Sequence, residues 1–104
     1  MTEKDYCDYD TCVALEELGY PRYCYDNGGE LDKILRMVTL YNAHKWLREE
    51  KKIHIEVLYQ PATWTCKIYK LTTYEYIKGY TFFNSYEETL LEGIKEAIKI
   101  LKEE

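Results

Sequence analysis

The spacing of the apolar residues changes from a helical to a strand period at Ile53. Before Ile53, core-type positions recur at intervals of three and four residues, at Leu40, Ala43, His44 and Leu47. From Ile53 onward, apolar residues occupy every second position, at Ile55, Val57 and Tyr59. The first spacing is typical of a helix packed by one face, and the second of a half-buried strand. The sequence therefore predicts a helix that begins after Thr39 and leads directly into a β-strand.

The cations near this junction are explained by the end of the predicted helix. The segment WLREEKKIHIEV combines a tryptophan with clustered cations, a composition that also suits nucleic-acid binding. Arg48, Lys51 and Lys52 lie in the last turns of the helix, where each cation interacts favourably with free carbonyl groups by about 0.3–1 kcal/mol. We therefore interpret this segment as a helix end followed by a strand.

Two further strands are predicted after the first. Gln60-Pro61-Ala62 interrupts the first strand, and TWTCKIYKL then resumes the alternation after a connection short enough for an antiparallel hairpin. One face of this second strand carries Trp64, Cys66 and Ile68, and the other carries Thr65, Lys67 and Tyr69. A third strand is predicted within TYEYIKGYTFF, where Gly79 is expected to mark a bulge or bend.

Helices are predicted on both sides of these strands. Near the N-terminus, Asp10 is the expected N-cap of a helix over residues 11–18, which Gly19 ends in a left-handed conformation. The pattern Ser85-Tyr86-Glu87-Glu88 is typical of a capping box, in which Ser85 and Glu88 each bond the other's amide. An apolar stripe follows it, with members Leu90, Ile94, Ala97, Ile98 and Leu101. Gly93 within that helix indicates a close approach to the sheet.

The predicted fold class is α+β, with the order α-α-β-β-β-α and a three-stranded antiparallel sheet packed on helices. A length of 104 residues, of which 46% are apolar, fits a single domain over residues 1–104. Within it, residues 1–9 are expected to form an N-terminal tail, and residues 20–38 a loop region between the first two helices.

No motif in the sequence indicates a cofactor or a catalytic reaction. The four cysteines are Cys7, Cys12, Cys24 and Cys66, and none of them forms the C-x-x-C pair of common zinc sites. Glycine motifs for nucleotide phosphates are missing as well. We therefore expect no cofactor, no metal and no enzyme activity, although the sequence leaves open whether Cys7, Cys12 and Cys24 bind metal or pair.

The chain is expected to act in the cytoplasm. No segment approaches the eighteen or so apolar residues of a membrane-spanning helix, and the start MTEKDYCDYD is acidic where a secretory signal would be basic. The cysteines are accordingly expected to be reduced thiols.

Tyrosine dominates the aromatic residues and indicates a binding surface. The sequence contains twelve tyrosines, two tryptophans and two phenylalanines, and a tyrosine buries its ring while its hydroxyl stays in water. The predicted outer face of the sheet gathers His54, Lys67, Tyr69, Lys70, Tyr74 and Tyr76. Tyrosine-rich surfaces are typical of protein interfaces, and tyrosines with cations also stack on single-stranded nucleic acid. We favour an unknown protein partner.

A nucleic-acid-associated module is the alternative, because the charge is unevenly distributed. Residues 33–82 hold nine Lys and Arg against four Asp and Glu, a net charge of +5, within a chain of net charge −5. This basic segment either binds nucleic acid or lies against the acidic ends. Double-stranded-RNA-binding domains share the order helix, three strands, helix. They grip phosphates at the start of the last helix, where Glu87 and Glu88 would here repel them.

Three segments of the chain carry a resemblance to known sequences. They are YDTCVALEELGYP, TLYNAHKWLREEKKIHIEV and SYEETLLEGIKEAIKILKE. Together they resemble a group of small proteins of Bacteroides-type gut bacteria and their phages, for which no activity is established. The resemblance implies an accessory protein of a phage or mobile element, acting in the cytoplasm of a bacterial host, and it assigns no functional residues.

Overall fold

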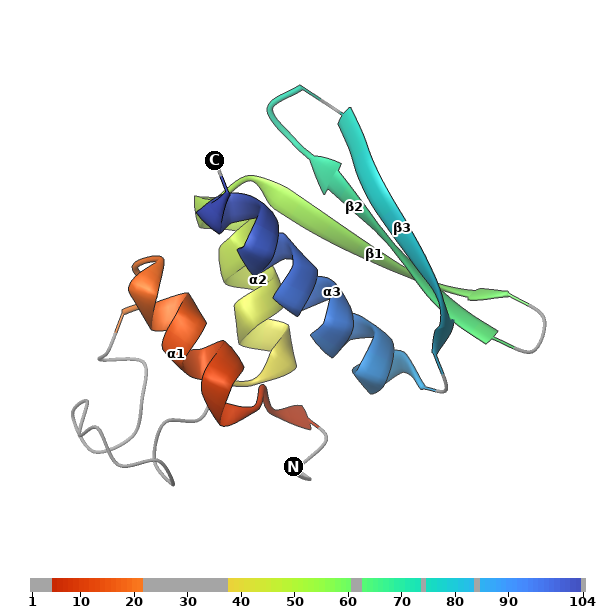
Figure 1. Ribbon diagram of the computed structural model, residues 1–104, viewed down its shortest axis with the longest axis horizontal. Coiled ribbons are helices and arrows are strands. Elements are labelled where there is room, and N and C mark those ends of the chain that lie inside the picture. The colour runs from red at the N-terminus through yellow and green to blue at the C-terminus, as the bar shows by residue number, and fades with distance from the viewer. Residues whose placement is uncertain (1–4, 22–37, 61–62, 74, 84, 104) are drawn as a thin grey trace.

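The computed structural model describes residues 5–21, 38–60, 63–73, 75–83 and 85–103. The helices are α1 (Tyr9–Glu17), α2 (Leu40–Glu50) and α3 (Tyr86–Lys102), and the strands are β1 (Ile53–Gln60), β2 (Thr63–Lys70) and β3 (Glu75–Phe83). This order confirms the predicted α+β fold, including the helix-to-strand switch at Ile53. All three helices lie on one side of the sheet, and all begin at the same end of the molecule (Figure 1).

The sheet is antiparallel, with the strand order β1-β2-β3. Its register pairs Ile55 of β1 with Ile68 of β2, and both side chains are buried on the face toward the helices. Gly79 pairs with Lys67, and β3 shifts register on both sides of this pair. The irregularity predicted near Gly79 is therefore present, as two shifts that flank the glycine.

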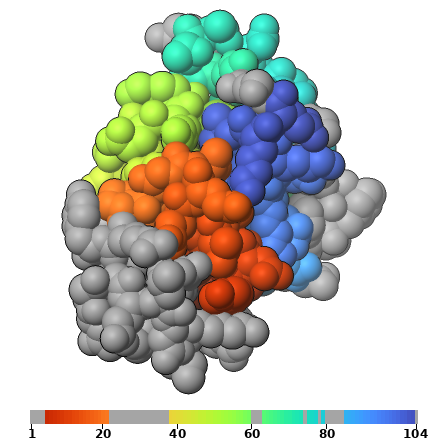
Figure 2. All heavy atoms as spheres, turned by 60° about the vertical axis from the view of Figure 1, so that its left-hand side comes forward, coloured from red at the N-terminus to blue at the C-terminus, as the bar shows by residue number. Residues whose placement is uncertain are grey.

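The core lies between the sheet and the helices. Its largest fully buried side chains are Leu15, Leu47, Ile53, Ile55, Ile68, Ile94, Thr89, Cys12 and Cys66. Helix α3 packs across all three strands, whereas α2 packs on β1 and on α3. Helix α1 forms the outermost element of the helical side, beside α3 (blue) and the yellow-green middle of the chain in Figure 2.

The first helix begins earlier than the sequence predicts. Its N-cap is Asp8 and not Asp10, because an Asp8 Oδ1 atom accepts a hydrogen bond of 2.8 Å from the Thr11 amide. Asp10 instead lies in the first turn, where its charge suits the positive end of the helix dipole. Gly19 has a φ angle of +109°, as predicted, and the bonds from Gly19 N to Glu16 O and from Tyr20 N to Leu15 O form a Schellman motif.

The junction between α2 and β1 shows how the cations end the helix. Lys52 adopts a left-handed conformation with a φ angle of 57°, and its ammonium group donates a 2.7 Å hydrogen bond to the Glu49 carbonyl oxygen. Lys51 lies 5.5 Å from the ring centroid of Trp46. Lys51 and Lys52 therefore both contact residues of the helix that they follow.

The chain before α1 is tied to the start of α2. Tyr6 forms an isolated antiparallel bridge with Thr39, and the Cys7 amide donates a 2.8 Å hydrogen bond to the Val38 carbonyl oxygen. The residues of the expected tail over 1–9 that are described are thus packed onto the domain. Most of the loop region expected over 20–38 lies outside the described residues, and its two described ends, Tyr20 and Val38, are buried.

Candidate functional site

The register of the sheet brings together three of the predicted binding residues. His54 pairs with Tyr69, and Tyr69 pairs with Tyr76, so the three form one row across β1, β2 and β3. The rings of Tyr69 and Tyr76 are tilted against each other at a centroid distance of 5.7 Å, and the Tyr76 side chain is 55% exposed. Lys67 lies two residues before Tyr69 on β2, so its side chain is on the same face of the sheet. We call these four residues the outer row.

Two other predicted residues do not join the outer row. Lys70 pairs with Ile53 and Glu75, and Ile53 is buried on the face toward the helices. Because successive side chains of a strand alternate between faces, this row belongs to the helix side of the sheet. Tyr74 lies outside the described residues. The binding role assigned to the outer row stays a prediction.

His54 is held at the edge of the sheet by a residue of α2. Its imidazole ring stacks on that of His44, with a centroid distance of 5.4 Å and an interplanar angle of 24°. His44 also forms a hydrogen bond with the Ile55 backbone on β1, which is an edge strand. Covering an edge strand with a helix protects it from pairing with other chains. His44 and His54 therefore attach α2 to the sheet.

Both imidazole rings are held in their neutral form. Burial is the main cause that lowers the pKa of His44, followed by the neighbouring His54 and Arg48. Burial and Arg48 also lower the pKa of His54, against the opposing effect of Glu56. Neither ring therefore adds a positive charge to this part of the surface near neutral pH.

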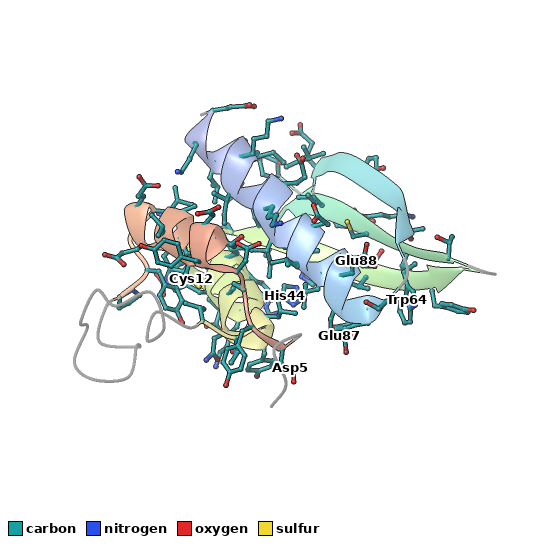
Figure 3. The ribbon with its side chains drawn as sticks, turned by 60° about the horizontal axis from the view of Figure 1, so that its bottom comes forward. Asp5, Cys12, His44, Trp64, Glu87 and Glu88 are labelled. Carbon is teal, nitrogen blue, oxygen red and sulfur yellow. The ribbon has the colours of Figure 1, made fainter. Side chains whose placement is uncertain are left out.

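A pocket opens where α2 and α3 begin, and we call it the end pocket. Its volume is about 340 Å³, and its lining residues are Asp5, Thr39, Leu40, Tyr41, His44, Tyr86, Glu87 and Leu90. Figure 3 shows Asp5, His44 and Glu87 gathered at this end of the molecule, with Trp64 on the far side of Glu87. Leu40 and Leu90 are buried, so the pocket combines an apolar floor with polar walls.

Local capping interactions bring the residues of the end pocket to this position. The Thr39 hydroxyl accepts a 3.0 Å hydrogen bond from the Asn42 amide, and the Ser85 hydroxyl accepts one of 3.1 Å from the Glu88 amide. Each cap starts a helix at the same end of the molecule. The first helical turns therefore present Tyr41 from α2 and Glu87 from α3 to a shared space.

Three aromatic rings lead from the sheet to the end pocket, and we call them the aromatic ladder. The ring of Trp64 stands edge-on to Tyr59 at a centroid distance of 5.0 Å and edge-on to Tyr86 at 5.9 Å. Tyr86 is also a wall of the end pocket. Tyr59 is 64% exposed and Tyr86 45%, while Tyr41 on another wall of the pocket is 69% exposed.

The sequence interpretation missed the end pocket, although it placed both caps. Thr39 is followed by a tyrosine two residues later, and Ser85 by one immediately. A tyrosine in the first turn of each of two helices is a sequence signal that could have indicated an aromatic surface at this end of the molecule. What the sequence lacks is the information that α2 and α3 lie beside each other with the same ends together.

The cysteines form no metal centre in the described part of the chain, where no group of three or more Cys, His, Asp or Glu residues could hold an ion. Cys7, Cys12 and Cys66 are buried, and none of the three forms a disulfide within the described residues. Burial, together with the neighbouring Cys12 and Asp8, raises the pKa of the Cys7 thiol far above its usual range. Cys24, the remaining cysteine, lies outside the described residues.

The described residues include no helix that is both long and apolar enough to cross a membrane. No protein-family model matches the chain, and no curated protein or solved structure matches it significantly. The geometry of the site is therefore the basis for a functional proposal.

Proposed function

We propose that this chain is a non-enzymatic binding protein that docks on a protein partner through the aromatic ladder and the end pocket. The observation that carries the proposal is the continuity of these two features, since Tyr86 belongs to both. Tyrosine and tryptophan are enriched among the residues that dominate binding energy at protein interfaces. Their rings supply a large contact area and lose little conformational entropy on binding.

The charge of the end pocket favours a protein over a nucleic acid as the partner. Asp5 and Glu87 line the pocket, and no lysine or arginine is among its described lining residues. A nucleic acid gains most of its affinity from contacts between phosphates and cations, which this lining does not offer. The resemblance to proteins of gut bacteria and their phages supports a bacterial or phage protein as the partner, and a role as a phage or mobile-element accessory factor.

The proposal is tested by selecting peptides from a random displayed library on the purified protein. We expect the selected peptides to lose at least about tenfold in affinity for Tyr86→Ala or Tyr59→Ala, which is a typical loss for a central interface residue. Tyr76→Ala is the matched control, because it removes a similarly exposed tyrosine from the outer row. Circular dichroism and thermal unfolding verify that each variant is folded.

Two results would contradict this docking surface. One is a selection that yields no binding peptide. The other is a set of peptides whose affinity falls for Tyr76→Ala and not for Tyr86→Ala, which would assign the interface to the outer row.

A nucleic-acid-associated function is the second candidate, favoured by the outer row. There the neighbouring rings of Tyr69 and Tyr76 lie close to Lys67, which is two residues from Tyr69 on β2, and this arrangement suits the stacking of unpaired bases beside a phosphate contact. This function requires binding to single-stranded probes that weakens steeply with salt and is lost in Tyr76→Ala. A gel shift without any complex at low salt would exclude it.

A further inference from the structure

We infer that the end pocket receives an uncharged aromatic side chain that carries a hydrogen-bond donor, namely a tyrosine or tryptophan of the protein partner. The inference rests on the proposed function and deepens it, because it names the chemistry that the partner must present. It depends on the balance of charge at the pocket, its apolar floor, its aromatic walls and one carboxylate that has no partner.

The charges around the end pocket are close to balance. Glu87 contributes one negative charge to the lining, and the starts of α2 and α3 each contribute a partial charge of roughly +0.5. Asp5 already has an interaction partner within the protein. Burial lowers the pKa of His44 and keeps its imidazole neutral, and the described lining residues include no lysine or arginine. The pocket therefore selects neither a cation nor an anion by charge.

The floor of the pocket is apolar and suits a single large side chain. Leu40 and Leu90 line the pocket and are 5% and 3% exposed. The volume of about 340 Å³ lies at the lower end of the range of ligand pockets, which is about 300–1,000 Å³. Aromatic rings bury the largest areas among side chains, so an aromatic ring gains most from contact with this floor.

The aromatic walls favour a ring in the same place. Tyr41 and Tyr86 come from the first turns of two different helices, and both line the pocket. Aromatic rings attract one another in edge-to-face and offset arrangements, beyond the gain from buried area alone. Tyr86 already stands edge-on to Trp64 at a centroid distance of 5.9 Å, so its ring loses little conformational freedom when another ring packs against it.

The Glu87 carboxylate is the polar group that the entering side chain has to satisfy. It lines the pocket in a half-buried position, and it forms no hydrogen bond or ion pair with the described residues. A purely apolar group would displace water from this carboxylate without replacing the lost hydrogen bond. A tyrosine hydroxyl or a tryptophan N–H donates that bond while its ring covers Leu40 and Leu90. The carboxylate thus favours tyrosine over phenylalanine.

The experiment compares four small probes that differ only in one side chain: the N-acetyl methylamides of tyrosine, phenylalanine, lysine and glutamate. Phenylalanine lacks the donor, and lysine and glutamate add a charge of either sign. Each probe is titrated into the isotope-labelled protein, and the methyl signals of Leu40 and Leu90 are followed by nuclear magnetic resonance. We expect the tyrosine probe to bind most tightly, in the millimolar range that its small size allows, and about threefold to tenfold more tightly than phenylalanine.

Two neighbouring acids of α3 provide a matched pair of variants. Glu87→Ala removes the acceptor that lines the pocket, whereas Glu88→Ala removes the same group one residue away, at an exposed position outside the lining. We expect Glu87→Ala to reduce the preference for tyrosine over phenylalanine to less than about twofold, because the donor then has no carboxylate to bond. Glu88→Ala should leave this preference unchanged. Circular dichroism verifies that both variants are folded.

Four outcomes would overturn the inference: a phenylalanine probe that binds as tightly as tyrosine, a lysine or glutamate probe that binds as tightly or more tightly, an equal preference for tyrosine in Glu87→Ala and the wild type, or no shift with any probe. The proposed function is judged separately by the displayed peptides. Peptides that depend on Tyr86 but carry no recurring tyrosine or tryptophan would leave the docking surface in place and remove only the aromatic anchor.

Discussion

A Cβ atom added to Gly93 of α3 would lie 2.7 Å from the Cγ2 atom of Ile55 on β1. Ile55 is 1% exposed, and its branched side chain cannot turn away without losing core contacts. An alanine at this position gains about 1 kcal/mol of helix propensity, but overpacking a core typically costs 1–3 kcal/mol. We predict that Gly93→Ala lowers the free energy of unfolding by up to about 2 kcal/mol.

Urea denaturation followed by circular dichroism measures this change. Lys99→Ala is the control, because Lys99 is exposed on the same helix and its replacement should change stability by less than about 0.5 kcal/mol. A Gly93→Ala variant that is more stable than the wild type would show that α3 has room to move away from the sheet.

The N-cap of α3 allows a second prediction, which separates the two halves of the expected capping box. The structure confirms the half in which Ser85 accepts a bond from the Glu88 amide. The return bond from the Ser85 amide to the Glu88 carboxylate is not among the hydrogen bonds of the described residues. Ser85→Ala should therefore cost about 0.5–2 kcal/mol of stability, and Glu88→Gln less, in the same denaturation experiment. Equal losses of stability in the two variants would indicate that Glu88 also bonds the Ser85 amide and that the capping box is complete.

Most of the fold could be predicted because its signals are local. The change of period at Ile53, the caps at Thr39 and Ser85 and the turn at Gly19 each depend on a few neighbouring residues. The start of α1 was predicted wrongly for the same reason. Asp8 and Asp10 are both good capping residues, and the sequence does not reveal that the chain just before Asp8 is held by the bond from the Cys7 amide to the Val38 carbonyl oxygen.

The candidate site could be predicted only in part. The outer row follows from alternation along β2 together with hairpin pairing. Lys70 lies two residues after Ile68 and four after Cys66 on the same strand, so strict alternation already places its side chain on the helix side of the sheet. The stacking of His54 on His44 and the end pocket both depend on where α2 lies beside β1 and α3. No periodicity along a single chain segment carries that information.

The buried cysteines give a third prediction, on thiol reactivity. Thiolates and not thiols react with iodoacetamide, and burial raises the pKa of Cys7 so that its thiolate is scarce. Cys12 is also buried, with its Sγ atom 3.7 Å from the Cys7 carbonyl oxygen. We predict that Cys7 and Cys12 are alkylated at least tenfold more slowly in the native protein than in urea, as measured by mass spectrometry of peptides. Rapid native labelling of Cys7 would contradict its burial.

The paired histidines give a fourth prediction, on the pH dependence of stability. His44 and His54 have folded-state pKa values below 6.5, whereas in the unfolded chain they titrate near that value. As the pH falls through 6.5, the unfolded state takes up protons that the folded state does not, so the free energy of unfolding falls. Their contribution is complete above the unfolded pKa and is lost as the pH falls toward the folded values.

His54→Gln tests whether the pair causes this loss of stability. The variant removes one titrating ring and the repulsion between two imidazolium groups beside Arg48, while Glu56, the other charged group that acts on His54, stays in place. Free energies of unfolding measured in urea at pH 7.5 and 5.5 should therefore differ less in His54→Gln than in the wild type. A pH dependence that is the same in both proteins would mean that the histidine pair does not limit stability in acid. The loss would then have to come from the carboxylates, which titrate at lower pH.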